Sequence, residues 1–325
     1  MFRPTCSIEM LKRRHEIVRA IRQFFDEREF VEVTTPLLSH DTVIDRHIDP
    51  VELPAARAVD RVEFGERLFL QTSPEFGMKR LLAAGASKIY QLAHAFRRNE
   101  LGQFHNIEFQ MLEWYETDID YVAGRKFLGE LFGELFGDRS VVERSYRDVF
   151  RESIGLDPLS SSIEQLQLAA KNKKSDDWVR QSNDRDEVLN WLLSQVIQPD
   201  LGKGKQIEIV FDWPASQSAL AKTRIDTDGI VVSERFEAFV DGEELANGYH
   251  ELLDAEELAG RNRENNALRI ADGKVGLPET SRLLDAMRFG LPSCCGVAVG
   301  VDRLVMKLTG MSSLSDVMPF PFERA

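Results

Sequence analysis

Two strand-like segments meet at the dipeptide Asp241-Gly242, and no other feature of the chain constrains its fold as strongly. Asp-Gly favours the tight turn with positive φ angles that joins neighbouring antiparallel strands. The sequence therefore predicts a hairpin of Glu234–Val240 and Glu244–Leu252 over this turn. A domain that contains such a hairpin must be built on a sheet with antiparallel strands.

The amino-terminal segments predict a helix, a short strand and an irregular stretch. Apolar residues recur at helical spacing over Ser7–Glu29, which predicts an amphipathic helix. Phe30–Thr35 predicts a strand, and Pro36 ends it because proline cannot donate a hydrogen bond to a sheet. The residues from there to Asp60 are polar, and we expect them to be irregular.

A second helix and two facing strands are predicted next. Ser73-Pro74-Glu75 places an N-cap residue, a proline and an acid at the start of a helix, which we expect to end at Ala84 with Gly85 as its stop. Lys88–Arg98 and His105–Tyr115 predict antiparallel strands joined by a polar loop. Alternation in the second strand puts six residues on one face: His105, Ile107, Phe109, Met111, Glu113 and Tyr115.

The rest of the pattern places residues 1–325 in one domain of the α+β class. Residues 124–205 are polar and mostly helical and carry no chemical motif, so we expect an insertion or a cap there. Glu208–Trp213 predicts a strand, Asp254 a helix N-cap, and Gly296–Gly300 a last strand that leads into a helix. Strands joined by hairpins, with helices around them, are typical of an antiparallel sheet flanked by helices.

The balance of 41 basic and 54 acidic residues gives a net charge of −13. An acidic field repels nucleic acid, so it disfavours tRNA as a partner and favours a cationic ligand or protein surface. The three cysteines, Cys6, Cys294 and Cys295, lack metal-ligand spacing, which indicates reduced thiols in a cytoplasmic protein. No apolar run is long enough for a membrane span.

Arg97 and Phe109 form the first candidate site. Arg97 ends one strand and can reach a phosphate, while Phe109 on the facing strand offers a flat surface for a base. Taken singly, each is more often a surface charge or a core aromatic. Their combination favours a nucleotide site.

The hairpin over Asp241-Gly242 is acidic where a core sheet should be apolar. Asn247, Tyr249 and Glu251 share one face, and Glu237 lies on the partner strand. Glu244 is out of phase with Glu251, which predicts a bulge near residues 247–248. Buried carboxylates need a cation or a metal, whereas an ordinary solvated face would need neither.

The last predicted strand has a small face of Gly296, Ala298 and Gly300, with valines on the other face. Small residues at alternate positions let a ligand lie against the backbone. Arg303 follows in the next helix and can turn back toward that ligand.

These groups of residues resemble the signature motifs of the class II aminoacyl-tRNA synthetases. Phe30–Leu37 is similar to the first, dimer-forming motif, Phe96–Glu113 to the second and Gly296–Arg303 to the third. The resemblance runs from about Ile8 to Ala325. It implies the catalytic-domain fold of this class, a homodimer, ATP as co-substrate and Mg²⁺.

Further segments resemble the lysine-specific branch of this class: Ser73–Glu75, Met111–Tyr115 and Asn247–Leu252. Lysyl-tRNA synthetases carry an amino-terminal anticodon-binding barrel, whereas this chain begins at the helix before the first motif. It is therefore more similar to the truncated paralogues that attach (R)-β-lysine to a lysine of elongation factor P. Ala298, where the synthetases have glycine, and the dipeptide Glu113-Trp114 also follow the paralogues.

The resemblance implies a role for each matching residue. Arg97 would bind the substrate carboxylate and the α-phosphate, Arg303 the γ-phosphate, and Glu237 with Glu244 would hold Mg²⁺. The other implied ATP contacts are Arg98, Asn99, Glu100, His105, Asn106, Phe109, Leu245 and Gly300, and Glu244 also counts among them. The implied substrate contacts are Ser73, Pro74, Glu75, Glu113, Tyr115, Asn247, Tyr249, Glu251 and Ala298.

Several alternatives stay open. The second motif usually reads Phe-Arg-x-Glu, but Asn99 occupies the glutamate position and Glu100 follows it, so either could read the adenine amine. The substrate is α-lysine or β-lysine, and the acceptor is elongation factor P or another amine. Rival interpretations are a lysyl-tRNA synthetase module whose anticodon domain is supplied in trans, and a non-catalytic amino-acid-binding regulator.

Overall fold

A computed structural model describes residues 2–55, 58 and 66–325. The chain divides into two compact units: unit 1 comprises Met1–Ile119 and Leu252–Ala325, and unit 2 comprises Asp120–Glu251. Each unit is described by itself. Among the described residues, no helix combines the length and the apolar character that crossing a membrane requires.

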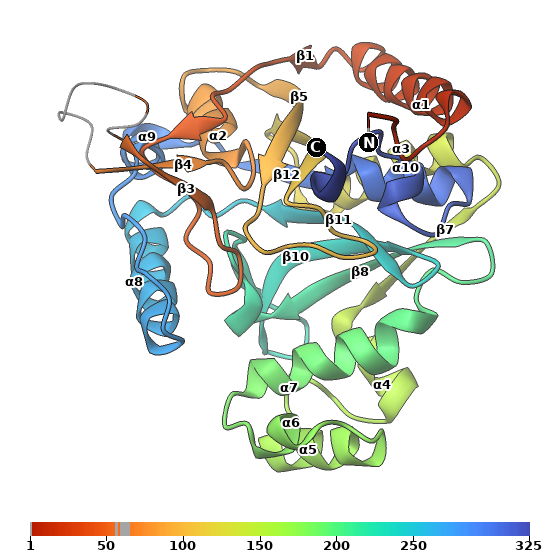
Figure 1. Ribbon diagram of the computed structural model, residues 1–325. Coiled ribbons are helices and arrows are strands. Elements are labelled where there is room, and N and C mark those ends of the chain that lie inside the picture. Colours follow the sequence, from red (N-terminus) through yellow and green to blue (C-terminus); the bar gives the residue numbers. More distant parts are fainter. Residues whose placement is uncertain (1, 56–57, 59–65) are drawn as a thin grey trace. The chain divides into compact units, whose positions relative to one another are not determined.

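The main sheet of unit 1 has the strand order β1-β5-β6-β12 (Figure 1). Its strands are β1 (Val31–Glu32), β5 (Lys88–Phe96), β6 (Glu108–Thr117) and β12 (Cys294–Gly300). The pair β5–β6 is antiparallel, as predicted; the pair β6–β12 is also antiparallel, whereas β1 runs parallel to β5. β1 is also shorter than the predicted strand, because only two of its residues pair with β5.

A second sheet in unit 1 was not expected. It has the order β2-β4-β3 and consists of β2 (Leu38–Ser39), β3 (Val51–Pro54) and β4 (Arg67–Leu70). The prediction of an irregular stretch up to Asp60 was therefore wrong for β2 and β3; positions 56, 57, 59 and 60 lie outside the described residues. These strands form because β4 pairs with both, and its Phe69 packs with Ile44 and Leu277 from distant segments.

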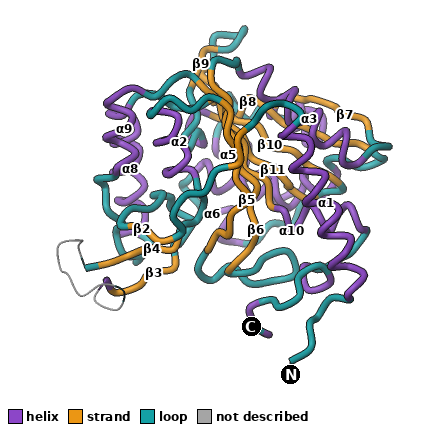
Figure 2. Tube along the Cα trace, turned by 90° about the horizontal axis from the view of Figure 1, so that it is seen from above, coloured by secondary structure: helices purple, strands orange, loops and turns teal. Residues whose placement is uncertain are grey.

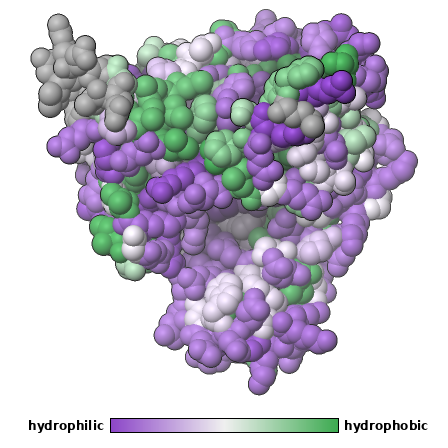
Figure 3. Space-filling view, viewed as in Figure 1, coloured by the Kyte–Doolittle hydropathy of each residue, from purple (hydrophilic) through white to green (hydrophobic). Residues whose placement is uncertain are grey.

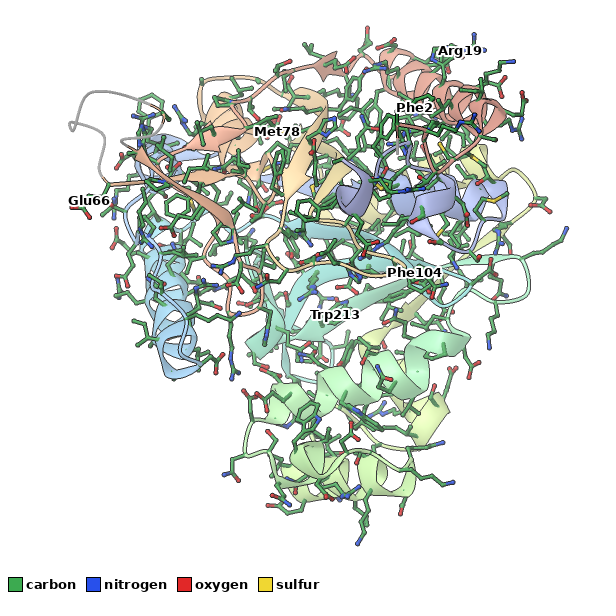
Figure 4. All side chains as sticks on the ribbon, viewed as in Figure 1. Phe2, Arg19, Glu66, Met78, Phe104 and Trp213 are labelled. Atoms are coloured by element: carbon green, nitrogen blue, oxygen red, sulfur yellow. The ribbon has the colours of Figure 1, made fainter. Side chains whose placement is uncertain are left out.

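The helices of unit 1 are α1 (Ile8–Asp26), α2 (Glu75–Ala83), α8 (Ala255–Ala271), α9 (Arg282–Gly290) and α10 (Val301–Thr309), with 3₁₀ turns at Leu314–Asp316 and Phe322–Arg324. The N-cap at Asp254 is confirmed, since its side chain accepts backbone N–H groups, and Ser7, where the first helix was expected to begin, is the N-cap of α1. The cap of α2 is Pro74 rather than Ser73, although the Ser73 hydroxyl accepts the Glu75 N–H at 3.1 Å. Helices α2, α8 and α9 lie side by side (Figures 1 and 2), and Met78 of α2 is fully buried (Figure 4).

The sheet of unit 2 has the order β11-β10-β8-β7, and β9 pairs with β10. Its strands are β7 (Ser140–Ser145), β8 (Gln206–Pro214), β9 (Thr223–Ile225), β10 (Val231–Val240) and β11 (Glu243–His250). The predicted hairpin is confirmed, with φ of 49° at Asp241 and 78° at Gly242. Strand β7 corrects the mostly helical pattern expected for residues 124–205, because it pairs in parallel with β8. The local sequence of β7, in which only Val141 and Val142 are apolar, does not indicate such a pairing.

The helices of unit 2 are α3 (Tyr121–Phe136), α4 (Tyr146–Ile154), α5 (Ile163–Asn172), α6 (Asp177–Gln181) and α7 (Arg185–Leu192), with a π-helical turn at Leu193–Ile197 and 3₁₀ turns at Gln198–Asp200 and Ala215–Gln217. Helices α4–α7 enclose a core in which Tyr146, Phe150 and Val188 are fully buried with Phe239 of β10. Their outer surface is mostly hydrophilic (Figure 3). The polar sequence of this region therefore belongs to the exterior of a packed helical layer.

Candidate functional site

In unit 1, the pairing of β6 with β12 puts the small residues beside the second-motif strand. Ala298 lies opposite Glu113, Gly296 opposite Tyr115 and Gly300 opposite Met111. Cross-strand partners project from the same face of a sheet. The small residues of β12 thus share a face with Glu113 and Tyr115, while the intervening valines of β12 are buried on the other face.

Arg97 and Phe109 come together at one end of this face. The Arg97 guanidinium carbon is 5.2 Å from the centroid of the Phe109 ring, and its backbone N–H donates to the Ile107 carbonyl at 2.9 Å. The Arg97 Nε is buried and finds no hydrogen-bond acceptor among the residues that the structure describes. A buried charged donor beside an aromatic face is suited to an anionic ligand that carries a base.

The connection between β5 and β6, residues 97–107, is named the nucleotide loop here. Asn99 adopts a left-handed conformation with φ of 66°, which asparagine tolerates better than most residues. The prediction that His105 lies on the strand was wrong, because a bridge between Gly102 and His105 closes a turn before β6 begins. Arg303 reaches this turn: its Nε donates to the Phe104 carbonyl at 3.1 Å, and one Nη is 2.7 Å from the His105 Nε2.

The structure separates the two candidates for reading adenine. Glu100 lies 3.9 Å from the Arg97 guanidinium, whereas Asn99 is exposed at the outside of the turn.

Two other predicted ATP contacts, Arg98 and Asn106, have partners within the protein. Arg98 donates its backbone N–H to the Asp49 carbonyl at 2.7 Å. The amide of Asn106 is bound within the protein, to Phe322 and Glu108, so this predicted ATP contact also has a structural task.

A polar cluster occupies the other end of the face in unit 1. The Glu113 carboxylate accepts one hydrogen bond from the Ser73 hydroxyl and one from the Tyr115 hydroxyl, both at 2.6 Å. Burial, and then the charge of Glu75, raise the pKa of Glu113 to about 7. Both carboxylate oxygens are therefore engaged, and Glu113 orients Ser73 and Tyr115.

Lys79 belongs to this cluster, and the sequence analysis missed it. Its ammonium lies 2.5 Å from Glu75, and both residues are buried, as is Pro74. The signal was present, because Glu75 and Lys79 stand four residues apart in a predicted helix. Glu75 is consequently a carboxylate that already has an internal cation.

In unit 2, the bulge of the acidic hairpin lies elsewhere than predicted. Glu237 pairs with Asn247 and Ala238 with Ala246, but Phe239 pairs with Glu244, so the extra residue is Leu245 and not one of residues 247–248. Leu245 is buried, and this apolar anchor explains the position of the bulge. The bulge brings Glu244 onto the same face as Glu237, Asn247 and Tyr249.

Glu237 is buried between a cation and another carboxylate. It accepts a hydrogen bond from Arg235 at 2.5 Å, and Arg235 in turn lies 4.3 Å above the Trp213 ring (Figure 4). Burial, and then the charge of Glu244, raise the pKa of Glu237 to about 8. Arg235 was missed by the sequence analysis, although its place two residues before Glu237 on a strand puts both on one face.

The residues of this hairpin fit a magnesium ion. Two carboxylates that repel each other are stabilised by a cation, and hard oxygen ligands suit Mg²⁺, which usually takes only one or two of them from protein. Among the described residues, no cluster of three or more His, Cys, Asp and Glu side chains could hold a metal without other ligands. The hairpin therefore suits a metal that shares its coordination with phosphates.

The remaining predicted substrate residues lie farther along β11. The Asn247 amide donates to the Tyr249 hydroxyl at 3.1 Å, and its Oδ1 is buried without a donor among the described residues. Glu251 follows the strand, is only 1% exposed and pairs with Ala221 in an isolated bridge. A buried acid and a buried amide oxygen are each suited to a cationic amine.

Comparison with known proteins identifies the family. A family model described as tRNA synthetases class II (D, K and N) matches residues 2–324. The chain belongs to this family. A class II relative from Pasteurella multocida (strain Pm70), the "Elongation factor P--(R)-beta-lysine ligase", is 41% identical over 327 residues, which cover 100% of this chain and 98% of the relative. Proteins of the same name from Salmonella paratyphi B and Salmonella schwarzengrund are also 41% identical to this chain. Each match extends over 325 residues, which cover 100% of this chain and 98% of the relative.

Proposed function

We propose that this class II enzyme is an adenylate-forming ligase that activates (R)-β-lysine with ATP and transfers it to a lysine side chain of elongation factor P. The observation that carries the proposal is the end-to-end match, at 41% identity, to proteins named as ligases of elongation factor P and (R)-β-lysine. The geometry of Arg97 over Phe109 supports it, because adenylate formation needs a cation at the α-phosphate and a surface for the base.

The first chemical step needs no side-chain base. An oxygen of the substrate carboxylate attacks the α-phosphorus, the bond from that phosphorus to the bridging oxygen breaks, and pyrophosphate leaves with the bonding electrons. Arg97 is the residue that we assign to the charge that develops at the α-phosphate, since its buried Nε donor is oriented before ATP arrives. Arg303 is assigned to the γ-phosphate.

In the second step, the neutral amine of the acceptor lysine attacks the acyl carbon. An amide bond forms, the bond to the AMP oxygen breaks, and the amine loses a proton. The residues of unit 1 that we assign to the nucleotide are Arg98, Asn99, Glu100, His105, Asn106, Phe109 and Gly300. In unit 2, Glu244 and the backbone of Leu245 complete this set.

Glu237 and Glu244 would hold Mg²⁺, which when bound supplies positive charge to the phosphates. Arg235 keeps Glu237 oriented and limits the repulsion between the carboxylates. For the substrate, we assign Glu75, Tyr115 and Glu251 to the two ammonium groups, because buried acceptors bind a dication well. Ser73, Pro74, Glu113, Asn247, Tyr249 and Ala298 complete the lining.

A homodimer is part of the proposal. Thr34, Leu81 and Phe289 are among the residues that line an apolar groove of about 710 Å³ in unit 1. Phe289 is 84% exposed and Val31 of the first motif 60% exposed, which is more apolar surface than a monomer usually leaves in water. Sedimentation should show a dimer at micromolar concentration; an active monomer would contradict this part.

The deciding experiment offers elongation factor P, ATP and either lysine isomer to the enzyme, and follows the mass of the factor. We expect a mass increase of one lysyl group that is faster with (R)-β-lysine. ATP–pyrophosphate exchange that depends on lysine should occur without added RNA. The proposed location is the cytoplasm, where ATP and elongation factor P are found. Exchange that appears only with tRNA would favour a synthetase module, and lysine binding without exchange would favour a regulator.

A further inference from the structure

The carboxy-terminal residues 311–325, named the C-terminal segment here, lie against the nucleotide loop. Two hydrogen bonds join them at Gln103: its carbonyl accepts the Leu314 N–H at 3.0 Å, and its side-chain amide donates to the Ser312 carbonyl at 2.8 Å. Gln103 itself is exposed. The outer turn of the loop is therefore tied to residues more than two hundred positions away in the chain.

A third hydrogen bond lies deeper, at Asn106. This side chain is 6% exposed; its Oδ1 accepts the backbone N–H of Phe322 at 2.9 Å, and its Nδ2 donates to the Glu108 carbonyl at 2.6 Å. An amide that loses a partner in a buried place pays the full cost of its desolvation. Asn106 thus connects the C-terminal segment to the first residue of β6.

The C-terminal segment is itself held in place. Leu314 and Val317 are buried, and Thr5 donates its backbone N–H to the Pro319 carbonyl at 2.9 Å and its hydroxyl to the Met318 carbonyl at 2.7 Å. The two termini accordingly lie close together (Figures 1 and 2). A segment anchored at its start and middle can restrain the loop that it touches.

The same loop is restrained from a second side by Arg303, through the Phe104 carbonyl and His105. Arg303 is assigned to the γ-phosphate, so ATP competes for its side chain. The contact of the C-terminal segment with Gln103 involves no group assigned to ATP, and the Asn106 Oδ1 is already taken by the Phe322 N–H. These contacts can order the loop before ATP binds.

We propose that the C-terminal segment positions the nucleotide loop for ATP, with the Phe322 N–H on Asn106 as the decisive contact. Phe322 is a positioning residue that acts through its backbone. The inference rests on the proposed function, because it takes the loop to be the ATP-binding element. Without this contact the loop keeps its hydrogen bonds at Gln103 and Phe104 but is less ordered before ATP binds, and the cost of ordering it lowers the affinity for ATP.

Two substitutions at Phe322 separate the backbone contact from the side chain. Phe322→Pro removes the N–H, and the preceding Pro321 is already extended with ψ of 162°, the conformation that a following proline requires. Phe322→Ala keeps the N–H and removes a ring that is 53% exposed. In lysine-dependent ATP–pyrophosphate exchange, the KM for ATP should be roughly three- to tenfold higher for the proline variant than for the alanine variant, as expected for one lost hydrogen bond to a buried group. The KM for lysine should agree within about twofold.

Amide hydrogen exchange measured without ligands gives a readout that does not depend on activity. Residues 99–106 should exchange faster in Phe322→Pro than in Phe322→Ala, with the rest of unit 1 unchanged. Equal KM for ATP and equal exchange in the two variants would overturn the proposal, as would faster exchange spread over the whole unit. If the unsubstituted enzyme forms no adenylate, the proposed function fails instead, and the exchange data still decide whether the segment holds the loop.

Discussion

The hairpins β5–β6 and β10–β11 present different charged groups and are closed by different means. The first presents Arg97 beside an aromatic ring, and the second presents Glu237 and Glu244 on one face. Hairpin β10–β11 turns over two residues whose positive φ angles suffice to close it. Hairpin β5–β6 has a long loop that is held by Arg303 and by the C-terminal segment.

The difference has consequences for mutation. The conformation of a two-residue turn is set by its own residues, so a substitution there should lower the free energy of unfolding and leave the catalytic rate unchanged. A long loop depends on contacts from distant segments, so damage to them should affect ligand binding before it affects stability. Hairpin β5–β6, named the arginine hairpin here, suits anionic phosphates. Hairpin β10–β11, named the carboxylate hairpin, suits a metal and a cationic substrate.

The largest effect should come from the arginine hairpin. Arg97→Ala should lower kcat/KM for ATP–pyrophosphate exchange by about a thousandfold, because a buried, pre-oriented charge at the reacting phosphate is lost. Arg97→Lys should recover only part of this, since an ammonium lacks the planar fork of a guanidinium. Arg13→Ala, on the exposed face of α1, is the matched control and should behave like the unsubstituted enzyme. Near-normal exchange in Arg97→Ala would remove Arg97 from the mechanism.

Glu251, which follows the hairpin strand β11, should affect binding of the substrate and not of the nucleotide. Glu251→Gln removes a buried charge from the proposed ammonium site and should cost roughly 2–5 kcal/mol of lysine binding. Calorimetry should find the affinity for ATP close to normal. Glu243→Gln makes the same chemical change next to the turn, where Glu243 pairs with Val240, and serves as the control. Equal losses for lysine and ATP would show that Glu251 is structural.

The strand beside the arginine hairpin should set the preference between lysine isomers. Ala298 lies opposite Glu113 on the small face, where its methyl group would press against an amine on the α-carbon. Ala298→Gly should therefore improve kcat/KM for α-lysine relative to β-lysine by roughly 10–200-fold, the worth of one methyl-sized contact in a tight pocket. An unchanged ratio would mean that Ala298 is only a packing choice.

Damage to the short turn should appear as lost stability. Gly242→Ala adds a Cβ at φ of 78° and 3.1 Å from the Pro199 carbonyl, so we expect a loss of about 1–2 kcal/mol in the free energy of unfolding. The rate of ATP–pyrophosphate exchange below the melting temperature should equal that of the unsubstituted enzyme. Gly133→Ala in α3, where a Cβ meets nothing within 4 Å, should instead stabilise by about 0.5–1 kcal/mol. Denaturant unfolding measures both.

The smallest effect concerns pH and Glu113 of the arginine hairpin. Its pKa of about 7 means that it is mostly neutral at pH 6 and mostly ionised at pH 8. Ionisation adds negative charge near a cationic substrate, so lysine affinity should rise roughly threefold across this range. Glu113→Gln should flatten the profile. A rise of the same size in that variant would assign the titration to another group.

Local sequence patterns predicted much of the fold. The turn at Asp241-Gly242, the cap at Asp254, the alternation of β12 and the facing of Arg97 and Phe109 each depend on a few neighbouring residues or on one strand pairing. Strands β2, β3 and β7 were missed because they are short and hold few apolar residues, so only their pairing with β4 and β8 defines them. The bulge was misplaced by two residues because the burial of Leu245 sets its position.

The sequence by itself determined the family chemistry: arginines at the strand ends, carboxylates on a sheet face and small residues where a ligand meets backbone. These features follow from side-chain type and from the two-residue period of a strand. Only the tertiary structure decided which charges neutralise one another, namely Lys79 with Glu75 and Arg235 with Glu237. It also decided that the end of the chain contacts the nucleotide loop, through Gln103 and Asn106. The partners of these hydrogen bonds on the C-terminal segment are backbone groups, which require no particular side chain, so no sequence pattern indicates them.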